Sequence, residues 1–228
     1  MKALVTVRSV LSSIDAKNAD VEQGPIVFVI DDDASLRESL SQLFRSVGLQ
    51  AKGFASTSEF LQNRLPDGPS CLVLDVRLQG HSGLELQSEL NRANIRIPIV
   101  FMTGHGDIPM TVRAMKAGAV EFLQKPFRDQ EILDAVQAGL DQDRDWRRGA
   151  IDTSRLKLCF ESLTPREQEI MGYVTSGLMN KQIAGEMRVS EITVKVHRGS
   201  VMRKMGARSL AELVRMTDAL GVQRIKKN

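Results

Sequence analysis

Short apolar runs along the chain alternate with longer stretches in which apolar residues recur every three or four positions. The runs lie at residues 26–30, 71–74, 97–102 and 120–124, and they are rich in Val, Ile and Leu. Runs of this length, separated by stretches of helical period, predict buried strands of a parallel sheet. A fifth strand is expected near residues 49–54.

The stretches between these strands have the period of amphipathic helices. Helices are expected at about residues 34–47, 58–65, 83–93, 108–117 and 129–141. The first carries one apolar stripe that includes Leu36, Leu40 and Phe44, and Gly48 is a natural stop. Five strands alternating with five helices predict an α/β domain, a doubly wound flavodoxin-like parallel sheet, over residues 25–142.

The segments on either side of this predicted domain lack a clear period. Residues 1–24 are expected to form a flexible arm, which a start site assigned too far upstream would also explain. Residues 143–162 are charge-rich, and Gly149 is expected to break any helix there. We therefore predict an interdomain linker with room for some helix.

Residues 163–228 carry the start and stop signals of four short helices. Thr164 to Glu167 and Ser209 to Glu212 are capping boxes, and Asn180 and Ser190 are candidate caps of two further helices. Tight joints between short helices predict a small all-α unit of the helix-turn-helix type. Its recognition helix is expected at residues 191–205.

Polar residues end the predicted strands. Asp31, Asp32, Asp75, Thr103 and Lys125 each follow or close an apolar run. The carboxyl ends of parallel strands share one edge of a sheet, so these side chains should converge. Clustered carboxylates suit a hard divalent cation, Mg²⁺ or Mn²⁺, and an ammonium can hold a phosphoryl oxygen. This chemistry predicts transfer of a phosphoryl group to one carboxylate. The neighbouring Asp33 is interpreted instead as a helix cap.

Composition narrows the possible classes. The chain has 228 residues, two Cys and three scattered His, which argues against a disulfide framework or a zinc site. A reduced cytoplasmic protein is expected from this cysteine usage. No apolar stretch approaches the ~20 residues that span a bilayer. Residues 25–145 hold 12 Lys and Arg against 17 Asp and Glu, whereas residues 163–228 hold 12 against 6. The basic carboxyl-terminal segment suggests a polyanionic partner, although a solvated surface would have the same composition.

The acidic set resembles the receiver domain of two-component response regulators of the FixJ type. The spacings of 44, 28 and 22 residues from Asp31 through Asp75 and Thr103 to Lys125 carry the resemblance. It implies that Asp75 is the phosphoacceptor. Asp32 would bind Mg²⁺ directly, with help from Asp31 and the backbone carbonyl of Arg77. Thr103 and Lys125 would respond to the phosphoryl group, and Phe122 would move with them; on sequence grounds alone Phe122 could equally be a core residue.

Two further features belong to this comparison. Residues 102–107 and 122–127 resemble the corresponding sequences of the FixJ subfamily. The resemblance also implies a cis peptide bond before Pro126. Gln79 stands where the family usually has Pro, four residues after the phosphoacceptor. Because Gln does not fix φ as Pro does, a looser loop is expected there.

The carboxyl-terminal unit resembles the LuxR/FixJ DNA-binding domain. Residues 163–167, Gly177, residues 180–184 and residues 190–197 carry this resemblance. Lys195 and Val196 are expected to face the bases, because Lys donates to guanine and Val contacts thymine methyls. Phosphate contacts are assigned to Lys181, Thr193, Arg198 and Arg203. His197 either packs on the core of its own domain or touches phosphate, and the role of Gly199 stays open.

These readings converge on a transcription regulator controlled by phosphorylation, not a turnover enzyme. Its expected partners are a sensor histidine kinase, promoter DNA, RNA polymerase and, after phosphorylation, a second copy of the chain. Two alternatives remain: a Mg²⁺-dependent phosphohydrolase acting through an aspartyl phosphate, and a regulator triggered by a small ligand. The missing lid segment argues against the first, and the complete acid cluster argues against the second.

Overall fold

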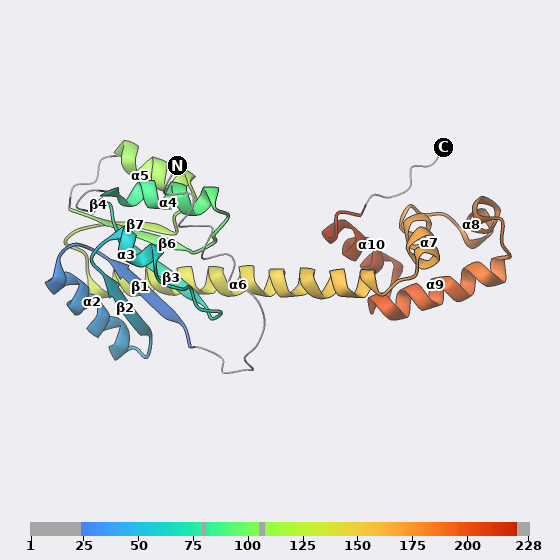
Figure 1. Cartoon of the computed structure of the whole chain (residues 1–228), viewed down its shortest axis with the longest axis horizontal. Coiled ribbons are helices and arrows are strands. Elements are labelled where there is room, and N and C mark those ends of the chain that lie inside the picture. The colour runs from blue at the N-terminus through green and yellow to red at the C-terminus, as the bar shows by residue number, and fades with distance from the viewer. Residues whose placement is uncertain (1–23, 79–80, 105–107, 223–228) are drawn as a thin grey trace. The chain divides into compact units, whose positions relative to one another are not determined.

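The described residues form two compact units, with the division between Arg147 and Arg148. The computed structural model describes residues 24–78, 81–104 and 108–222, and its helices and strands are labelled in Figure 1. The expected arm, residues 1–24, falls outside these ranges except for Gly24. Within the described residues, no helix is both long enough and apolar enough to cross a membrane.

A five-stranded parallel sheet forms the centre of the first unit. Its strands lie in the order β2-β1-β3-β6-β7, the order of a doubly wound sheet. Their bounds are Ile26–Ile30 (β1), Gln50–Phe54 (β2), Ser70–Asp75 (β3), Ile99–Thr103 (β6) and Glu121–Gln124 (β7). The five strands predicted from the sequence are thus confirmed. The chain also forms a short antiparallel pair, Arg77–Leu78 (β4) with His81–Ser82 (β5), which the apolar pattern does not reveal.

Helices follow the strands as the period predicts. They are Ala34–Ser46 (α2), Thr57–Leu61 (α3), Gly83–Arg92 (α4), Ile108–Lys116 (α5) and Asp129–Glu161 (α6). Side chains fix several starts: Asp33 accepts backbone N–H groups at the start of α2, and Ser82 forms a capping box with Glu85 at α4. The predicted helix at 58–65 is shorter than expected. It begins at Thr57, where Ser56 caps it, and ends at Leu61, four residues before the predicted end.

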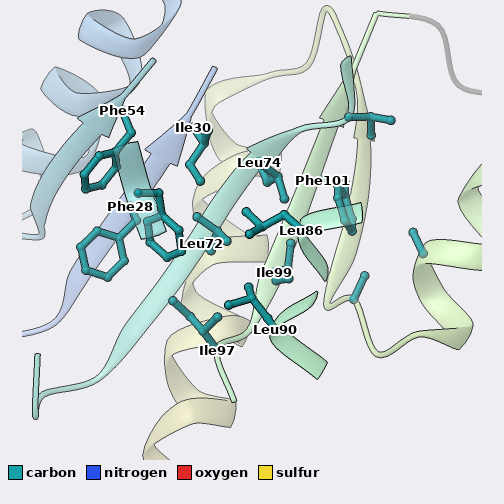
Figure 2. Packing of buried hydrophobic residues seen from close by; sticks show 14 residues of the cluster. Phe28, Ile30, Phe54, Leu72, Leu74, Leu86, Leu90, Ile97, Ile99 and Phe101 are labelled. Atoms are coloured by element: carbon teal, nitrogen blue, oxygen red, sulfur yellow. The ribbon is translucent and has the colours of Figure 1, made fainter. Parts of the chain in front are cut away.

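The sheet buries both faces, and alternate residues of each strand enter different cores. Phe28, Leu72 and Phe101 point to one face, together with Leu86 and Leu90 of α4 (Figure 2). Phe60 of α3 and Ala114 of α5 belong to the same core cluster. The strand neighbours Val73 and Val100 point to the other face, against α2 and α6. Burial on both sides explains why the strands are continuous apolar runs rather than alternating ones.

The helix after β7 is much longer than predicted. The expected helix at 129–141 continues through Gly149 to Glu161, so the prediction that this glycine breaks the helix is wrong. One glycine costs only about 1 kcal/mol in a helix, and the surrounding residues are good helix formers. The ion pair of Arg147 with Asp143, four residues apart, adds support.

Asp143 also fastens α6 to the sheet. Its carboxylate accepts the backbone N–H of Ser70 at 2.8 Å, and the Arg147 guanidinium donates to the carbonyl of Asp67 at 2.8 Å. Burial, together with the charge of Asp143, raises the pKa of the Cys71 thiol to about 12. Cys71 is therefore a protonated core residue, as its place in a strand predicts.

The second unit contains four further helices around its own core. They are Pro165–Thr175 (α7), Asn180–Met187 (α8), Glu191–Met205 (α9) and Leu210–Ala219 (α10). Ile170, Ile183, Val194, Val201 and Leu213 meet in the core, one or two from each helix. The bounds match the predicted helix-turn-helix, and Thr164, Ser190 and Ser209 cap as expected.

Asn180 does not act as the predicted cap. It is the first residue of α8, which begins after Met179, and its side-chain oxygen accepts from the Arg198 guanidinium at 3.1 Å. The Gln182 side chain instead reaches back to the Met179 backbone N–H at 2.9 Å. Asn180 therefore bonds to Arg198, 18 residues away, and does not cap the helix as its residue type suggests.

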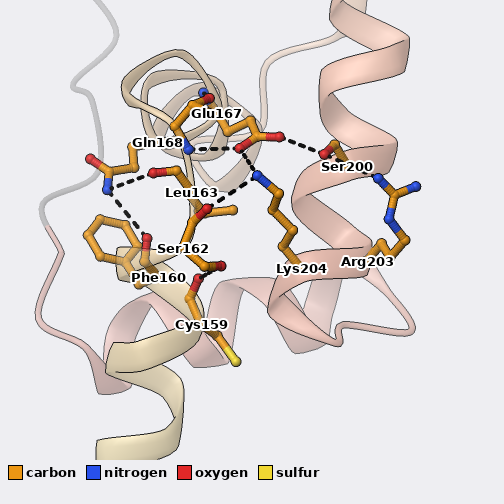
Figure 3. Close-up of polar contacts among 10 residues, drawn as sticks. Cys159, Phe160, Ser162, Leu163, Glu167, Gln168, Ser200, Arg203 and Lys204 are labelled. Carbon is orange, nitrogen blue, oxygen red and sulfur yellow. Dashed lines mark hydrogen bonds and ion pairs between the residues drawn. The ribbon is translucent and has the colours of Figure 1, made fainter.

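A buried carboxylate ties α9 to the start of α7. Glu167 accepts Lys204 Nζ at 2.7 Å, Ser200 Oγ at 2.6 Å and the backbone N–H of Thr164 at 2.8 Å (Figure 3). Lys204 also donates to the carbonyl of Ser162 at 3.2 Å. The hydrogen bond from Lys204, followed by those from Ser200 and Thr164, lowers the pKa of Glu167 to about 2. The helix that the sequence assigns to DNA recognition is thus held at its C-terminal half.

Replacing Glu167 tests this tie. Because the pKa of Glu167 falls from 4.5 to about 2 on folding, its stabilisation is complete above pH 4.5 and is lost as the pH falls toward 2. We expect Glu167→Gln to lower the unfolding free energy of the second unit by about 1–3 kcal/mol at pH 7. The difference from the natural chain should shrink below pH 4.5. Amide hydrogen exchange of α7 and α9 in the full chain measures both effects.

Glu169→Gln is the matched control. Glu169 is exposed and pairs only at the surface with Arg166, at 2.9 Å, so its loss should cost no more than about 1 kcal/mol. Equal exchange rates in the two variants at neutral pH would contradict a special role for Glu167.

Candidate functional site

Two carboxylates and one ammonium meet at the carboxyl edge of the central sheet. Asp31 follows β1 directly, Asp75 ends β3, and Lys125 follows β7. Lys125 Nζ lies 2.7 Å from Asp31 Oδ2 and 2.6 Å from Asp75 Oδ2. The Lys125 backbone N–H donates to the carbonyl of Thr103, the last residue of β6, at 2.7 Å. The convergence predicted from the strand ends is therefore present in the structure.

The local backbone explains how the two adjacent aspartates differ. Asp31 is 1% exposed, and its second oxygen accepts the N–H of Asp33 at 2.9 Å. Its carbonyl accepts the Arg37 guanidinium at 2.7 Å, which ties the strand end to α2. Asp32 is exposed beside it. Asp33 caps α2 through the N–H groups of Ser35 and Leu36, so its interpretation as a helix cap is confirmed.

Asp75 is buried and held from both sides. One oxygen accepts the backbone N–H of Arg77 at 2.9 Å, and the other meets Lys125. Gly83 lies against it, since an added Cβ there would come within 2.4 Å of the Asp75 carbonyl oxygen. The start of α4 can approach the strand end only because position 83 is glycine. In the sequence, position 83 marks only the expected start of a helix, since no local pattern reveals this approach.

The charges of this site influence each other strongly. Burial raises the pKa of Asp31, despite the hydrogen bond and charge of Lys125, and the nearby charge of Asp75 adds to the rise. Burial alone would lower the pKa of Lys125, but hydrogen bonds and charges from Asp31 and Asp75 together raise it. One ammonium is shared by two buried carboxylates, so the site has unmet demand for positive charge.

The donor set suits a divalent cation. Asp31, Asp32 and Asp75 each offer a carboxylate oxygen, and these oxygens lie within 4.8 Å of one another. Oxygen donors at this density are the ligands that Mg²⁺ takes in proteins. With Lys125 counted, the cluster carries a formal charge of −2, which a divalent ion would neutralise.

The remaining predicted receiver residues line the same sheet edge or its neighbourhood. Thr103 is fully buried at the end of β6. Phe122 is half-buried in β7, with its ring centroid 6.1 Å from that of Phe101. The peptide between Lys125 and Pro126 is cis, as the resemblance implies. Gln79 and residues 105–107 lie outside the described residues.

In the second unit, the predicted DNA-contacting residues gather on α8 and α9. Lys181, Lys195, Val196 and Arg203 are exposed, whereas Thr193, His197 and Arg198 are half-buried. Ser190 Oγ and Thr193 Oγ1 are hydrogen-bonded at 2.8 Å, so the Thr193 side chain contacts the residue that caps α9. Arg198 is engaged with Asn180 and so also joins α9 to α8. The half-burial of His197 leaves its two readings open.

Comparison with known proteins agrees with this arrangement. Residues 27–137 match the response regulator receiver domain, and residues 161–217 match the luxR family of bacterial regulatory proteins. Nodulation protein W of Bradyrhizobium diazoefficiens is 61% identical over 86% of this chain and 87% of its own length. Transcriptional regulatory protein FixJ of Azorhizobium caulinodans is 44% identical over 86% of this chain and 93% of its own.

A solved structure gives the same result at the level of the fold. The response regulator StyR is 52% identical and covers 86% of this chain and 99% of its own, with a TM-score of 0.76. The relatives therefore share both units in the same order, and the acidic edge and the helix-turn-helix lie inside the matched ranges. This chain belongs to the family of two-component response regulators that join a receiver domain to a LuxR-type DNA-binding domain.

Proposed function

We propose that this regulator is switched by a phosphoryl group on Asp75, supplied by a sensor histidine kinase. The observation that carries the proposal is the pair of contacts from Lys125 to Asp31 and Asp75, at 2.7 and 2.6 Å. This arrangement places a nucleophilic carboxylate beside a cation and two further acids. It is suited to receive a phosphoryl group and not to retain a neutral ligand.

In the proposed reaction, an Asp75 oxygen attacks phosphorus as the phosphorus–nitrogen bond to the kinase histidine breaks. The imidazole leaves, and an acyl phosphate remains on Asp75. Lys125, already within 2.6 Å of the attacking carboxylate, then pairs with a phosphoryl oxygen. Thr103, buried at the neighbouring strand end, is assigned the other phosphoryl contact.

The proposal includes Mg²⁺, with Mn²⁺ as a substitute. Asp31, Asp32, Asp75 and the backbone carbonyl of Arg77 would hold it, and the fit of the three carboxylates supports this. When bound, the ion offsets negative charge on the transferred group. Asp32 is the side chain most available to it, because Asp31 already accepts from Lys125 and from the N–H of Asp33.

The output would be pairing of two receivers. Movement of Thr103 and Phe122 toward the phosphoryl group would change the neighbouring face of α5. That face is apolar and exposed: Ile108, Val112 and Met115 are 81%, 43% and 40% exposed. A second copy of the chain would cover it, and paired α9 helices would bind two half-sites of promoter DNA in the cytoplasm. RNA polymerase is the proposed further partner, and no catalytic turnover is assigned to the protein.

Removing the acceptor should abolish labelling. We expect the natural chain, treated with Mg²⁺ and acetyl phosphate, to gain the mass of one phosphoryl group, and Asp75→Asn to gain none. Intact-protein mass spectrometry measures this, with Asp33→Asn as the control that keeps an acidic-to-amide change outside the cluster. Equal labelling of Asp75→Asn would refute the assignment, and repeated turnover of a phosphate ester would favour a phosphohydrolase.

Metal binding can be separated from phosphorylation. Asp32→Asn should weaken Mg²⁺ binding by about tenfold or more, because one of three clustered carboxylates is lost. Asp33→Asn should leave it unchanged, since that carboxylate caps α2 and Asn caps equally well. Calorimetric titration of the full chain gives both dissociation constants. Identical constants would show that Asp32 is not a ligand.

Pairing through α5 makes a third expectation. In the presence of beryllium fluoride, Val112→Glu should weaken dimerisation by about tenfold or more, because association would bury a charge. Val47→Glu is the matched control, since Val47 is 52% exposed and lies at the end of α2, away from this face. Sedimentation velocity distinguishes monomer from dimer. Dimerisation of the Val112 variant at the natural strength would exclude α5 as the interface.

A further inference from the structure

The recognition helix α9 carries two large apolar side chains that its own domain does not bury. Val194, Val201 and Met205 turn into the core, whereas Ile192 and Val196 are 76% and 66% exposed. The two exposed residues are four positions apart, so they lie on one face, one above the other. Single exposed apolar residues are ordinary on protein surfaces. An aligned pair on a recognition helix instead indicates a surface that binds a partner.

The same face is otherwise cationic and open. Lys195 and Arg203 are exposed there, and α9 as a whole has four Lys and Arg against one acid, Glu191. At Gly199, one turn after Val196, an added Cβ would meet no described atom within 4 Å apart from its chain neighbours and the backbone of its own helix. The domain's own packing therefore does not require glycine, and the open space lies where a partner would approach.

The charge selects the partner. A second copy of α9 would bring like charges together, which disfavours self-association through this face. Duplex DNA supplies phosphates for Lys195 and Arg203 and, in the floor of the major groove, one apolar group: the C5 methyl of thymine. A surface that is apolar at its centre and cationic around it matches that groove.

We infer that Ile192 selects thymine by contact with its methyl group, as is already expected of Val196, which makes Ile192 a second specificity-determining residue on the same face. The inference rests on the proposed binding of α9 in the major groove. Four residues span about 6 Å of helix, and base pairs are spaced about 3.4 Å apart. The two thymines recognised should therefore lie one or two base pairs apart within a half-site.

The test changes the DNA and the protein in turn. The full chain, activated with beryllium fluoride, first selects its preferred duplex from a random pool. Each thymine of that duplex is then replaced singly by uracil, which removes the methyl and keeps the hydrogen-bonding edge. We expect two replacements, one or two base pairs apart, to weaken binding about fourfold each, as loss of one buried methyl contact implies.

Substitution of the protein assigns each thymine. Ile192→Ala should weaken binding to the thymine duplex and lose the response to uracil at one position, and Val196→Ala should do so at the other. Ile151→Ala is the matched control, because Ile151 is 66% exposed but lies on α6. It should keep both responses.

The possible results distinguish failure of the thymine inference from failure of the proposed DNA-binding function. Selection of a defined site, with no response to uracil or with the full response retained in Ile192→Ala, would overturn the inference alone. Failure of the activated chain to select any sequence would overturn the proposed function as well.

Discussion

Lys125 holds two buried carboxylates that would otherwise repel each other at the edge of a sheet. Asp31 and Asp75 end adjacent strands, and a single ammonium bridges them at 2.7 and 2.6 Å. Removing the ammonium would leave unpaired buried charge, a costly arrangement in any protein interior. The strand order, the approach of α4 at Gly83 and the cap of α2 all serve to bring these groups together. The negative charge at this site exceeds the positive charge. The excess favours binding of a metal cation, and such a cation would also support phosphoryl transfer.

The second unit also contains a buried carboxylate paired with a lysine, but its balance differs. Among the described residues Glu167 is the one carboxylate paired with Lys204, and it accepts two further hydrogen bonds, so its pKa falls to about 2. Asp31 shares its lysine with Asp75, and burial raises its pKa instead. Burial is the main cause of the difference: at Asp31 it outweighs the hydrogen bond and charge of Lys125, and the charge of Asp75 adds a smaller rise, whereas at Glu167 the hydrogen bonds outweigh burial. Glu167 is a fully satisfied anchor that holds α9 in place, whereas Asp31 belongs to a cluster that can respond to a new ligand.

The sequence predicts the features that depend on local pattern. Continuous apolar runs reveal the strands, and the residues that close them, Asp75 among these, reveal the edge at which the site forms. Features that depend on distant partners escape such reasoning. Asn180 is of a residue type that commonly caps helices, yet its side-chain oxygen accepts a hydrogen bond from Arg198 instead. Gly149 is a plausible breaker, but α6 continues because its neighbours favour helix by more than one glycine costs. The fastening of Asp143 to Ser70 joins positions 73 residues apart, which no local pattern contains.

The contacts of α6 with the receiver bear on how the two units would act together. Asp143 binds Ser70 at the start of β3, and Arg147 binds Asp67 in the loop before it, so the first half of α6 is fixed to the receiver. Under the proposed pairing through α5, each receiver would carry its own tethered DNA-binding unit into the dimer. The second binding event then becomes intramolecular, and its effective concentration rises without any new contact to DNA. Under this proposal, α9 would bind weakly as one copy and more tightly as two, because the receiver would supply the pairing and α9 the choice of sequence.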